Sequence, residues 1–266
     1  GIDFDLIGSD EHVVHDRDGQ VVVRLGADGA LLRVTLPEGT GKKAQLHGAL
    51  EKLRLRGVEN CDENLVARVV KESDGQFVRV GEFSYNPAND SIMAVDIVEH
   101  EMRATITVHT PGAGGVDLSA ESMIAFLKNN GVIHGILEEV LSEFDLNPRY
   151  DASILVAEGT TAREGANAKI SYNFDFERTE IKLKEKNGRV DFREMNLIQN
   201  VVEGQILAKK TSAERGSAGR TVTGKLLPAK DGKDCDIGIG KNVVLDDDGM
   251  SARSTINGQV MLVSDK

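Results

Sequence analysis

The chain has 266 residues, of which 40% are hydrophobic and 4% aromatic, and it contains no Trp. The formal net charge of −11 argues against a nucleic-acid partner and against an anionic membrane surface, because both select Lys and Arg. The two cysteines lie far apart, no apolar run reaches bilayer length, and the N-terminal residues are polar. We therefore expect a cytoplasmic protein without disulfides, signal peptide or membrane span.

The N-terminal part of the sequence contains two similar stretches that are 74 positions apart. The matching pairs are Val34 and Val108, Pro37 and Pro111, Gly41 and Gly115, Leu53 and Leu127, Gly57 and Gly131, and Val66 and Val140. This gap-free recurrence predicts an internal duplication.

The first copy is predicted to fold as β-α-α-β. Its opening strand is "ALLRVTL" (residues 30–36) and its closing strand is "QFVRV" (residues 76–80). Between them, Leu46, Leu50 and Leu53 form the apolar stripe of the first helix.

The second copy is predicted to have the same order of elements. Its strands are "RATITVHT" (residues 103–110) and "ASILVAEG" (residues 152–159). Ser119 is the expected N-cap of the first helix, which ends at Asn130-Gly131 because glycine adopts the left-handed conformation readily. The stripe of the second helix comprises Ile136, Leu137, Val140, Leu141 and Phe144.

From about Asn173 the sequence consists of short β-rich runs separated by glycines and charged turns. Hairpin signals lie at Asn187-Gly188, Asp248-Gly249 and Asn257-Gly258. The predicted fold class is therefore α+β, a duplicated β-α-α-β region followed by an all-β barrel and the start of a β-helix. The predicted domains are residues 1–98 (N-terminal strands and first repeat), 99–172 (second repeat) and 173–266 (barrel leading into β-helix).

The stretch "GRTVTGKLL" (residues 219–227) nearly matches the phosphate-binding loop G-x-x-x-x-G-K-[ST]. Leu226 replaces the hydroxyl residue that would hold magnesium, and Pro228 blocks the helix that such a loop requires. We predict instead a strand that ends in a glycine turn and leaves Lys225 exposed.

The other catalytic and metal motifs each fail on one requirement. The run "LDDDGM" lacks the spaced carboxylates and final Glu of a calcium loop, and the six histidines have no zinc-site spacing. Arg215 stands where a nucleophile elbow around Ser217 requires Gly. We therefore predict no catalytic residue, no metal site and no cofactor, so that the chain is not an enzyme.

An ordered series of stretches lies between Met102 and Val263. It comprises "GVIHGI" (131–136), "VAEGTTAREGANAKISY" (156–172), "GRVDFRE" (188–194), "VVEGQILAKKTSAERGSAGRTVTGKLL" (201–227) and "DGMSARSTINGQV" (248–260). In this series the chain resembles the bacterial flagellar assembly protein A (FapA) family. The first copy diverges, since Cys61 stands where the second Gly of G-V-x-x-G-I would be, and we expect its loop to differ there.

This resemblance implies a non-catalytic cytoplasmic scaffold or assembly factor that acts through protein–protein contacts. It also implies an N-terminal α+β region followed by a β-barrel or right-handed β-helix, and placement at the cell pole. The implied partners are other cytoplasmic, polar or flagellar proteins, with self-association as an additional mode. The sequence ends where a β-helix would begin, so either it is a piece of a longer protein or this member is short.

Two sets of residues follow as candidate structural and interaction positions. The glycines expected to form turns are Gly131, Gly135, Gly204, Gly216, Gly219 and Gly224. The basic residues Lys209, Lys210, Arg215 and Arg220 are expected on one interaction loop, which would suit RNA but which we interpret as a solvated hairpin.

The alternative to a scaffold is a small-molecule-binding or enzymatic module that uses the groove between the two repeats. A scaffold predicts an exposed strand edge or apolar patch where a partner or a second copy docks. The alternative predicts a concave pocket with converging ionisable groups of perturbed pKa. We prefer the scaffold because no motif supports chemistry.

Overall fold

The structure is a computed structural model of the chain that describes residues 15–173 and 199–261. Any strand before residue 15, the hairpin at Asn187-Gly188 and the stretch 188–194 lie outside the described residues. The fold is a mixture of α and β structure, with four α-helices and several antiparallel sheets in the described ranges. In that part of the chain, no helix combines the length and the apolar composition needed to cross a membrane.

The described residues divide into two compact units. The first unit extends to Thr160 and also includes Arg220–Lys225, and the remaining described residues form the second unit. Within the first unit we name residues 15–92 the first lobe and residues 93–160 the second lobe. Each lobe consists of a three-stranded antiparallel sheet and two helices.

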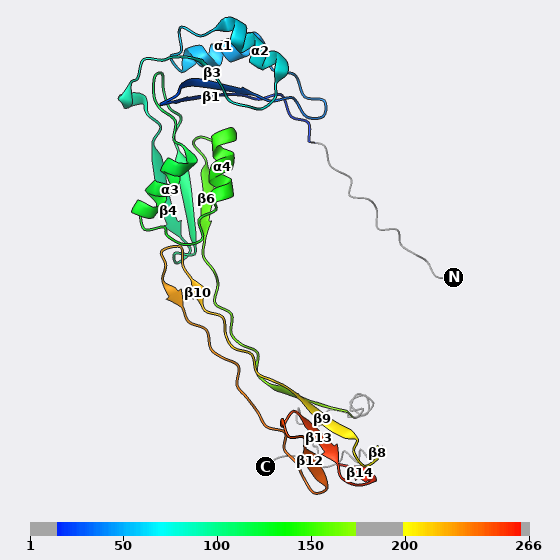
Figure 1. The fold of residues 1–266 in the computed structure, drawn as a ribbon. Helices are drawn as coiled ribbons and strands as arrows, with labels where there is room; N and C mark the ends of the chain where they lie inside the picture. The colour runs from blue at the N-terminus through cyan, green and yellow to red at the C-terminus, as the bar shows by residue number, and fades with distance from the viewer. Residues whose placement is uncertain (1–14, 174–198, 262–266) are drawn as a thin grey trace, which may run out of the picture. The chain divides into compact units, whose positions relative to one another are not determined.

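In the first lobe, helices α1 and α2 cover one face of the sheet (Figure 1). The elements are β1 (Val21–Gly26), β2 (Gly29–Val34), α1 (Leu46–Leu55), α2 (Glu63–Glu72) and β3 (Val78–Gly81), with strand order β1-β2-β3. Helix α2 begins where the Asp62 side chain accepts hydrogen bonds from two backbone N–H groups, and it buries Val66, Val69 and Val70 at helical spacing.

Two details of the first lobe differ from the prediction. The buried residues of α1 are Ala49 and Leu53, whereas Leu46 is 39% exposed because it lies at the first position of the helix, away from the sheet. Strand β1 lies outside the predicted β-α-α-β order, although N-terminal strands without stated bounds were expected before the first repeat. It pairs with β2 across the two-residue turn Ala27-Asp28, and Gly29 follows as the first residue of β2.

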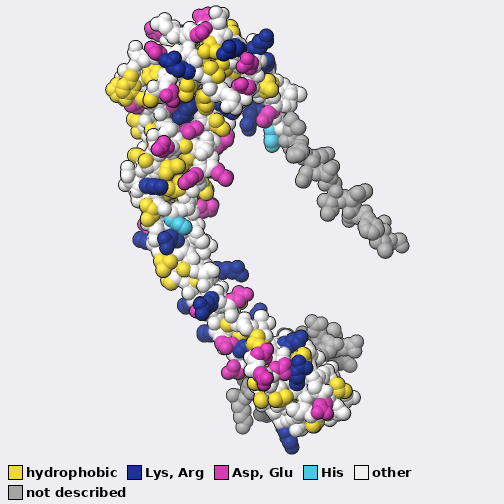
Figure 2. Space-filling model, in the orientation of Figure 1, with side chains coloured by type: hydrophobic (Ala, Val, Ile, Leu, Met, Phe, Trp, Pro, Cys, Tyr) yellow, Lys and Arg dark blue, Asp and Glu magenta, His cyan; other side chains and the backbone are white. Residues whose placement is uncertain are grey.

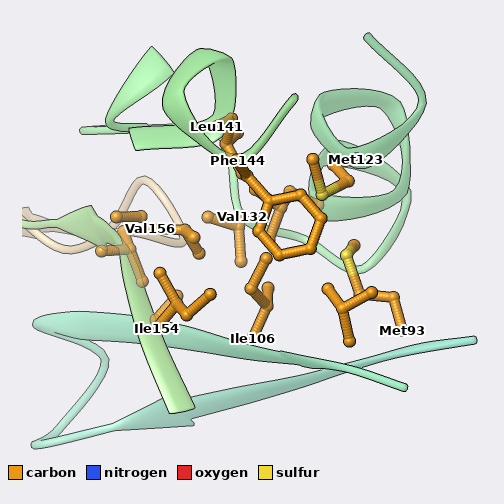
Figure 3. Packing of buried hydrophobic residues seen from close by; sticks show 13 residues of the cluster. Met93, Ile106, Met123, Val132, Leu141, Phe144, Ile154 and Val156 are labelled. Carbon is orange, nitrogen blue, oxygen red and sulfur yellow. The ribbon is translucent and has the colours of Figure 1, made fainter. Parts of the chain in front are cut away.

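In the second lobe, apolar side chains from the helices and the sheet meet in one core (Figure 3). The elements are β4 (Met93–Val98), β5 (Arg103–Val108), α3 (Ala120–Asn129), α4 (Glu138–Leu146) and β6 (Ser153–Glu158), with strand order β4-β5-β6. Strand β4 was also missing from the predicted order, and a short 3-10 helix, Pro87–Asn89, precedes it.

The ends of the helices in the second lobe follow local chemistry. Ser119 is the N-cap of α3, as predicted, and its hydroxyl accepts a hydrogen bond from the Ser122 N–H. Helix α4 begins two residues later than the predicted stripe. Ile136 forms a β-bridge with Ala157, and the Leu137 N–H donates to the Val156 carbonyl, so both residues are held to the sheet.

The same hydrogen bonds occur at corresponding positions of the two lobes, which also share the element order β-β-α-α-β. The bond from Val58 N to Leu53 O in the first lobe corresponds to the bond from Val132 N to Leu127 O in the second. Likewise, Gly75 N to Val34 O corresponds to Asp151 N to Val108 O. Lys42 N to Asp18 Oδ1 corresponds to Val116 N to Asp90 Oδ1. Four of these pairs of positions are 74 residues apart, whereas Gly75 and Asp151 are 76 apart and Asp18 and Asp90 are 72 apart.

The second unit contains only β structure among its described residues. Its strands are β7 (Lys169–Tyr172), β8 (Gln199–Val201), β9 (Ile206–Thr211), β12 (Val243–Leu245), β13 (Ser251–Ser254) and β14 (Gly258–Val260). The larger sheet has the order β12-β13-β9-β7, and β14 pairs with β8. In the described ranges no sheet closes on itself, so the predicted closed barrel is not found: the larger sheet is open, with β12 and β7 at the two ends of its strand order.

Gly135 and Gly131 provide a matched test of backbone constraint. Both have positive φ, at +72° and +86°, but a Cβ on Gly135 would collide with the Glu158 carbonyl oxygen, whereas a Cβ on Gly131 would meet nothing within 4 Å. We expect Gly131→Ala to lower the free energy of unfolding by about 1 kcal/mol. Gly135→Ala should lower it by about 3 kcal/mol or more, because the sheet must also move. Urea unfolding of both variants measures this, and equal losses would contradict it.

Candidate functional site

The segment that nearly matched a phosphate-binding loop contributes to packing. It forms β10 (Gly219–Arg220), a turn and β11 (Leu226–Leu227), and no helix follows it up to residue 261. The Lys225 side chain is 70% exposed, and its Nζ lies 2.7 Å from Oε2 of Glu101. The hydrogen bond from Lys225 lowers the pKa of Glu101. Val222, inside the turn, is fully buried in the core of the second lobe.

The six candidate turn glycines differ in backbone conformation. Positive φ values occur at Gly131, Gly135, Gly204 and Gly224. Gly219 lies in β10, and Gly216 lies where a Cβ would be 2.6 Å from the Lys230 carbonyl oxygen. Close backbone approach, rather than a turn, accounts for glycine at position 216. The Gly135 position of the first lobe is occupied by Cys61, which forms a β-bridge with Gly81.

The four candidate basic residues are spread over several elements and both units. Lys209 and Lys210 lie on β9, Arg215 follows that strand, and Arg220 lies on β10. The Lys210 Nζ lies 2.8 Å from Oδ1 of Asp234, and this hydrogen bond raises the pKa of Lys210. On the face shown in Figure 2, basic and acidic side chains are interspersed.

Few ionisable side chains are gathered in the described part of the chain. No group of three or more His, Cys, Asp or Glu side chains there could hold a metal ion. His109 and Asp151 form an exposed pair, with 2.8 Å between Nδ1 and Oδ1, and Thr110 donates to the same carboxylate. The hydrogen bond with His109 is the main reason that the pKa of Asp151 is lowered.

One concave feature of the first unit is a groove at the junction of its two lobes. Its volume is about 1180 Å³. One wall consists of the first residues of β1, the residues before them and one side of α1. The other wall consists of Thr110, Pro111, Glu143 and residues 147–150. We call the whole feature the junction groove.

The buried carboxylate of Asp117 connects the two lobes beside this groove. Its side chain is only 2% exposed. Oδ2 accepts hydrogen bonds from the Leu25 N–H at 2.8 Å and from Nη2 of Arg56 at 3.0 Å, and Oδ1 accepts one from the Tyr150 hydroxyl at 2.7 Å. The Asp117 N–H also donates to the Leu25 carbonyl at 3.0 Å. Asp117 therefore pairs with β1 through both its backbone and its side chain.

Arg56 and Arg24 of the first lobe also bond to the second lobe close to Asp117. Arg56 follows helix α1 and donates to the Gly115 carbonyl at 2.8 Å in addition to Asp117. Arg24, on β1, donates to the Leu118 carbonyl at 2.6 Å and lies 3.3 Å from Oδ1 of Asp145. Both arginine side chains are 12% exposed, so burial makes these pairs depend on complete hydrogen bonding.

Tyr150 occupies the second-lobe side of the junction. Its ring meets Phe144 edge-on, with centroids 5.8 Å apart. Burial, the charge of Asp117 and the hydrogen bond to Asp117 raise the pKa of Tyr150 far above its ordinary value, while Arg56 and Arg24 oppose that shift. The phenol is therefore kept protonated, as a donor to Asp117. Among the described residues, every buried side-chain nitrogen or oxygen has a hydrogen-bond partner.

The comparisons with known proteins identify a family. The sequence model of the family described as Flagellar Assembly Protein A N-terminal region matches residues 93–265. The chain belongs to this family. No curated protein and no solved structure matches the chain.

The flagellar assembly protein A match begins at Met93, the first residue of β4, and so covers the second lobe and most of the second unit. The stretch 131–136 connects α3 to α4, the stretch 156–172 runs from β6 to β7, and the stretch 248–260 includes β13 and β14. Strands β1 to β3 lie before the matched range. The junction groove is therefore built partly from residues outside the family match.

Sequence reasoning missed the residues of the junction. Asp117, Arg56 and Arg24 were not singled out, because no motif or periodicity marks a carboxylate that becomes buried against another lobe. One usable signal was the pattern "VVVRLG", in which Arg24 interrupts an apolar strand. A charged residue in a strand that is otherwise apolar indicates pairing with an opposite charge.

Asp117→Ala is expected to lower the free energy of unfolding by about 3 kcal/mol, because Arg56 would remain buried without its partner. Glu82→Ala is the matched control. Glu82 also lies 3.0 Å from an arginine, Arg79, but its side chain is 85% exposed, so its loss should leave stability close to that of wild type. Urea unfolding compares the two, and a similar effect of both substitutions would show that burial of the Asp117 pair is unimportant.

Tyr150→Phe should lower the free energy of unfolding by about 2 kcal/mol near pH 7, because Oδ1 of Asp117 loses its donor. The raised pKa of Tyr150 stabilises the folded state fully below the unfolded pKa, near 10, and that stabilisation is lost as pH rises toward the folded pKa. The difference between wild type and variant should therefore shrink above about pH 10. Unfolding measured at several pH values tests this, with the exposed Tyr85→Phe as control. A difference that grows with pH would contradict the assignment.

Proposed function

We propose that the chain is a non-catalytic cytoplasmic scaffold or assembly factor in flagellar assembly, acting through protein–protein contacts. The observation that carries the proposal is membership of the flagellar assembly protein A family, whose match covers residues 93–265. The proposed partners are other cytoplasmic, polar or flagellar proteins, and the proposed location includes the cell pole.

The hydrogen bonds made by the ionisable side chains at the junction support the proposal that the chain is non-catalytic. At the junction, Asp117 is held by three donors and Arg56 by several acceptors, so both side chains are committed to joining the lobes. A group held in this way is poorly placed to exchange protons with a substrate. Among the described residues, β1, β4 and β12 are edge strands, which supports the contact part because a strand edge can add a strand from another chain.

We further propose that the two lobes arose by internal duplication and that the chain is organised in the three segments 1–98, 99–172 and 173–266. The recurring hydrogen bonds of the two lobes support the duplication. The antiparallel strands β12, β13 and β14 stand where the predicted β-helix would begin, and the β-helix stays a prediction.

A second candidate function is binding of a small molecule in the junction groove. The observation that favours it is the volume of about 1180 Å³, which is large enough for a small molecule and somewhat above the usual range of ligand pockets. Under this alternative, ligand binding would stabilise the protein, whereas loss of the gene would leave the flagella unchanged.

Deletion of the gene is expected to reduce or misplace the flagella, because an assembly factor is lost. Swimming, counts of flagella and the position of a tagged full-length copy are the measurements. Restoration by the wild-type gene is the control. Normal motility together with a diffuse signal would contradict the proposed function and direct attention to a ligand in the groove.

A further inference from the structure

The outer edge of β1 is only partly used within the first unit. Strand β1 is the edge strand of its sheet, and the Thr35 N–H donates to the Gln20 carbonyl. Because backbone groups alternate in direction along an antiparallel strand, those of Val21, Val23 and Leu25 point away from β2. At Leu25 both groups are taken by Asp117. The second lobe thus already adds one extended residue to this edge.

In the part of the β1 edge that faces the junction groove, the backbone carbonyls have hydrogen-bond partners among the described residues but the N–H groups do not. The Val21 carbonyl accepts a hydrogen bond from Nζ of Lys52 at 2.9 Å, and the Val23 carbonyl accepts one from Nη1 of Arg56 at 3.4 Å. The N–H groups of Val21 and Val23 have no partner among the described residues. Two backbone donors, spaced as a strand spaces them, therefore face the groove.

Cationic side chains predominate around these donors. Lys52, Arg17 and Arg149 line the groove and are exposed, and the two arginine side chains have no partner in the described part of the chain. The carboxylates of the lining, Asp18 and Glu143, are already engaged by the Lys42 N–H at 2.7 Å and the Asn147 side chain at 2.8 Å. Arg17 and Arg149 therefore present positive charge to the groove without a carboxylate partner among the described residues.

The charge of the whole chain does not cancel this local preference. The formal net charge is −11, but at physiological ionic strength exposed charges are screened beyond about 8 Å. A segment lying in the groove is affected mainly by the nearest groups, which are the cationic Lys52, Arg17 and Arg149 together with the carboxylates of Asp18 and Glu143.

We propose that the junction groove binds a short extended segment of a partner protein that carries acidic side chains and adds to the free edge of β1. Its carbonyls accept hydrogen bonds from Val21 and Val23, and its carboxylates pair with Lys52 and Arg149. Alternate side chains face α1 on one wall and Pro148 and Tyr150 on the other. This inference rests on the proposed scaffold function and specifies the site and the chemistry of its partner.

Amide hydrogen exchange on the full chain tests the proposal directly. The probe is a pool of hexapeptides with Asp or Glu at alternate positions and Val, Ile, Leu or Phe between them, at about 1 mM. The Val21 and Val23 amides should exchange rapidly in the free protein and at least about tenfold more slowly with the probe. Val22, whose partner in β2 is Arg33, is the internal control and should change little.

Charge reversal tests the cationic contribution. Lys52→Glu combined with Arg149→Glu should weaken binding of the pool about tenfold, because two attractions become repulsions. The matched control combines Arg54→Glu on α1 with Lys128→Glu on α3, two exposed positions that do not line the groove, and should bind as wild type. Three results would overturn the proposal: no protection by the pool, equal protection by a pool with Lys in place of the acids, or the same protection by succinate alone, which indicates a small-anion site.

The proposed function and this inference fail in distinguishable ways. If gene deletion impairs the flagella and the Lys52→Glu, Arg149→Glu gene restores them, while the pool gives no protection, the scaffold stands and the groove is not its docking site. If the flagella are normal after deletion but the pool protects Val21 and Val23, the peptide site stands and the flagellar role fails. Because the exchange measurement uses the wild-type chain, it holds even if the charge-reversed variant does not fold.

Discussion

The buried carboxylate of Asp117 is the interaction on which the first unit depends. Removing a carboxylate from water costs several kcal/mol unless donors replace its hydration. Here the donors come from both lobes: the Leu25 N–H and Arg56 from the first, and the Tyr150 hydroxyl from the second. Each lobe is small, with only three strands and two helices. The hydrogen bonds of Asp117 therefore hold the two lobes against each other.

The same junction creates the groove. Asp117 occupies the β1 edge at Leu25 and leaves the edge open at Val21 and Val23, while Arg56 lies along it. The interface between the lobes adds one extended residue, Asp117, to the edge of β1. The next backbone donors along that edge face the groove and are available to a further segment. Assembly of the lobes and recognition of a further segment would use one physical mechanism.

The family match covers only one side of the groove. It starts at Met93 and includes Asp117 and Tyr150, but not β1, Arg24 or Arg56. The groove therefore combines a wall from the matched region with a strand edge from the region before it. A binding preference that depends on β1 belongs to this chain's own first lobe, whereas the flagellar association rests on the matched part.

Local sequence patterns determined much of the fold. The cap at Ser119 was predictable because capping depends on a hydrogen bond to a backbone group a few residues away.

Strand β4 was not predicted, β1 was expected only as an N-terminal strand without bounds, and α4 begins later than predicted. Strand pairing and the Leu137–Val156 hydrogen bond depend on the sheet, which local patterns do not specify. The open sheet of the second unit is similar, because alternation predicts strands but not whether β7 and β12 meet. Tertiary structure alone decided the junction: Asp117 lies 61 positions from Arg56 and 33 from Tyr150, and no local pattern encodes contacts over such distances.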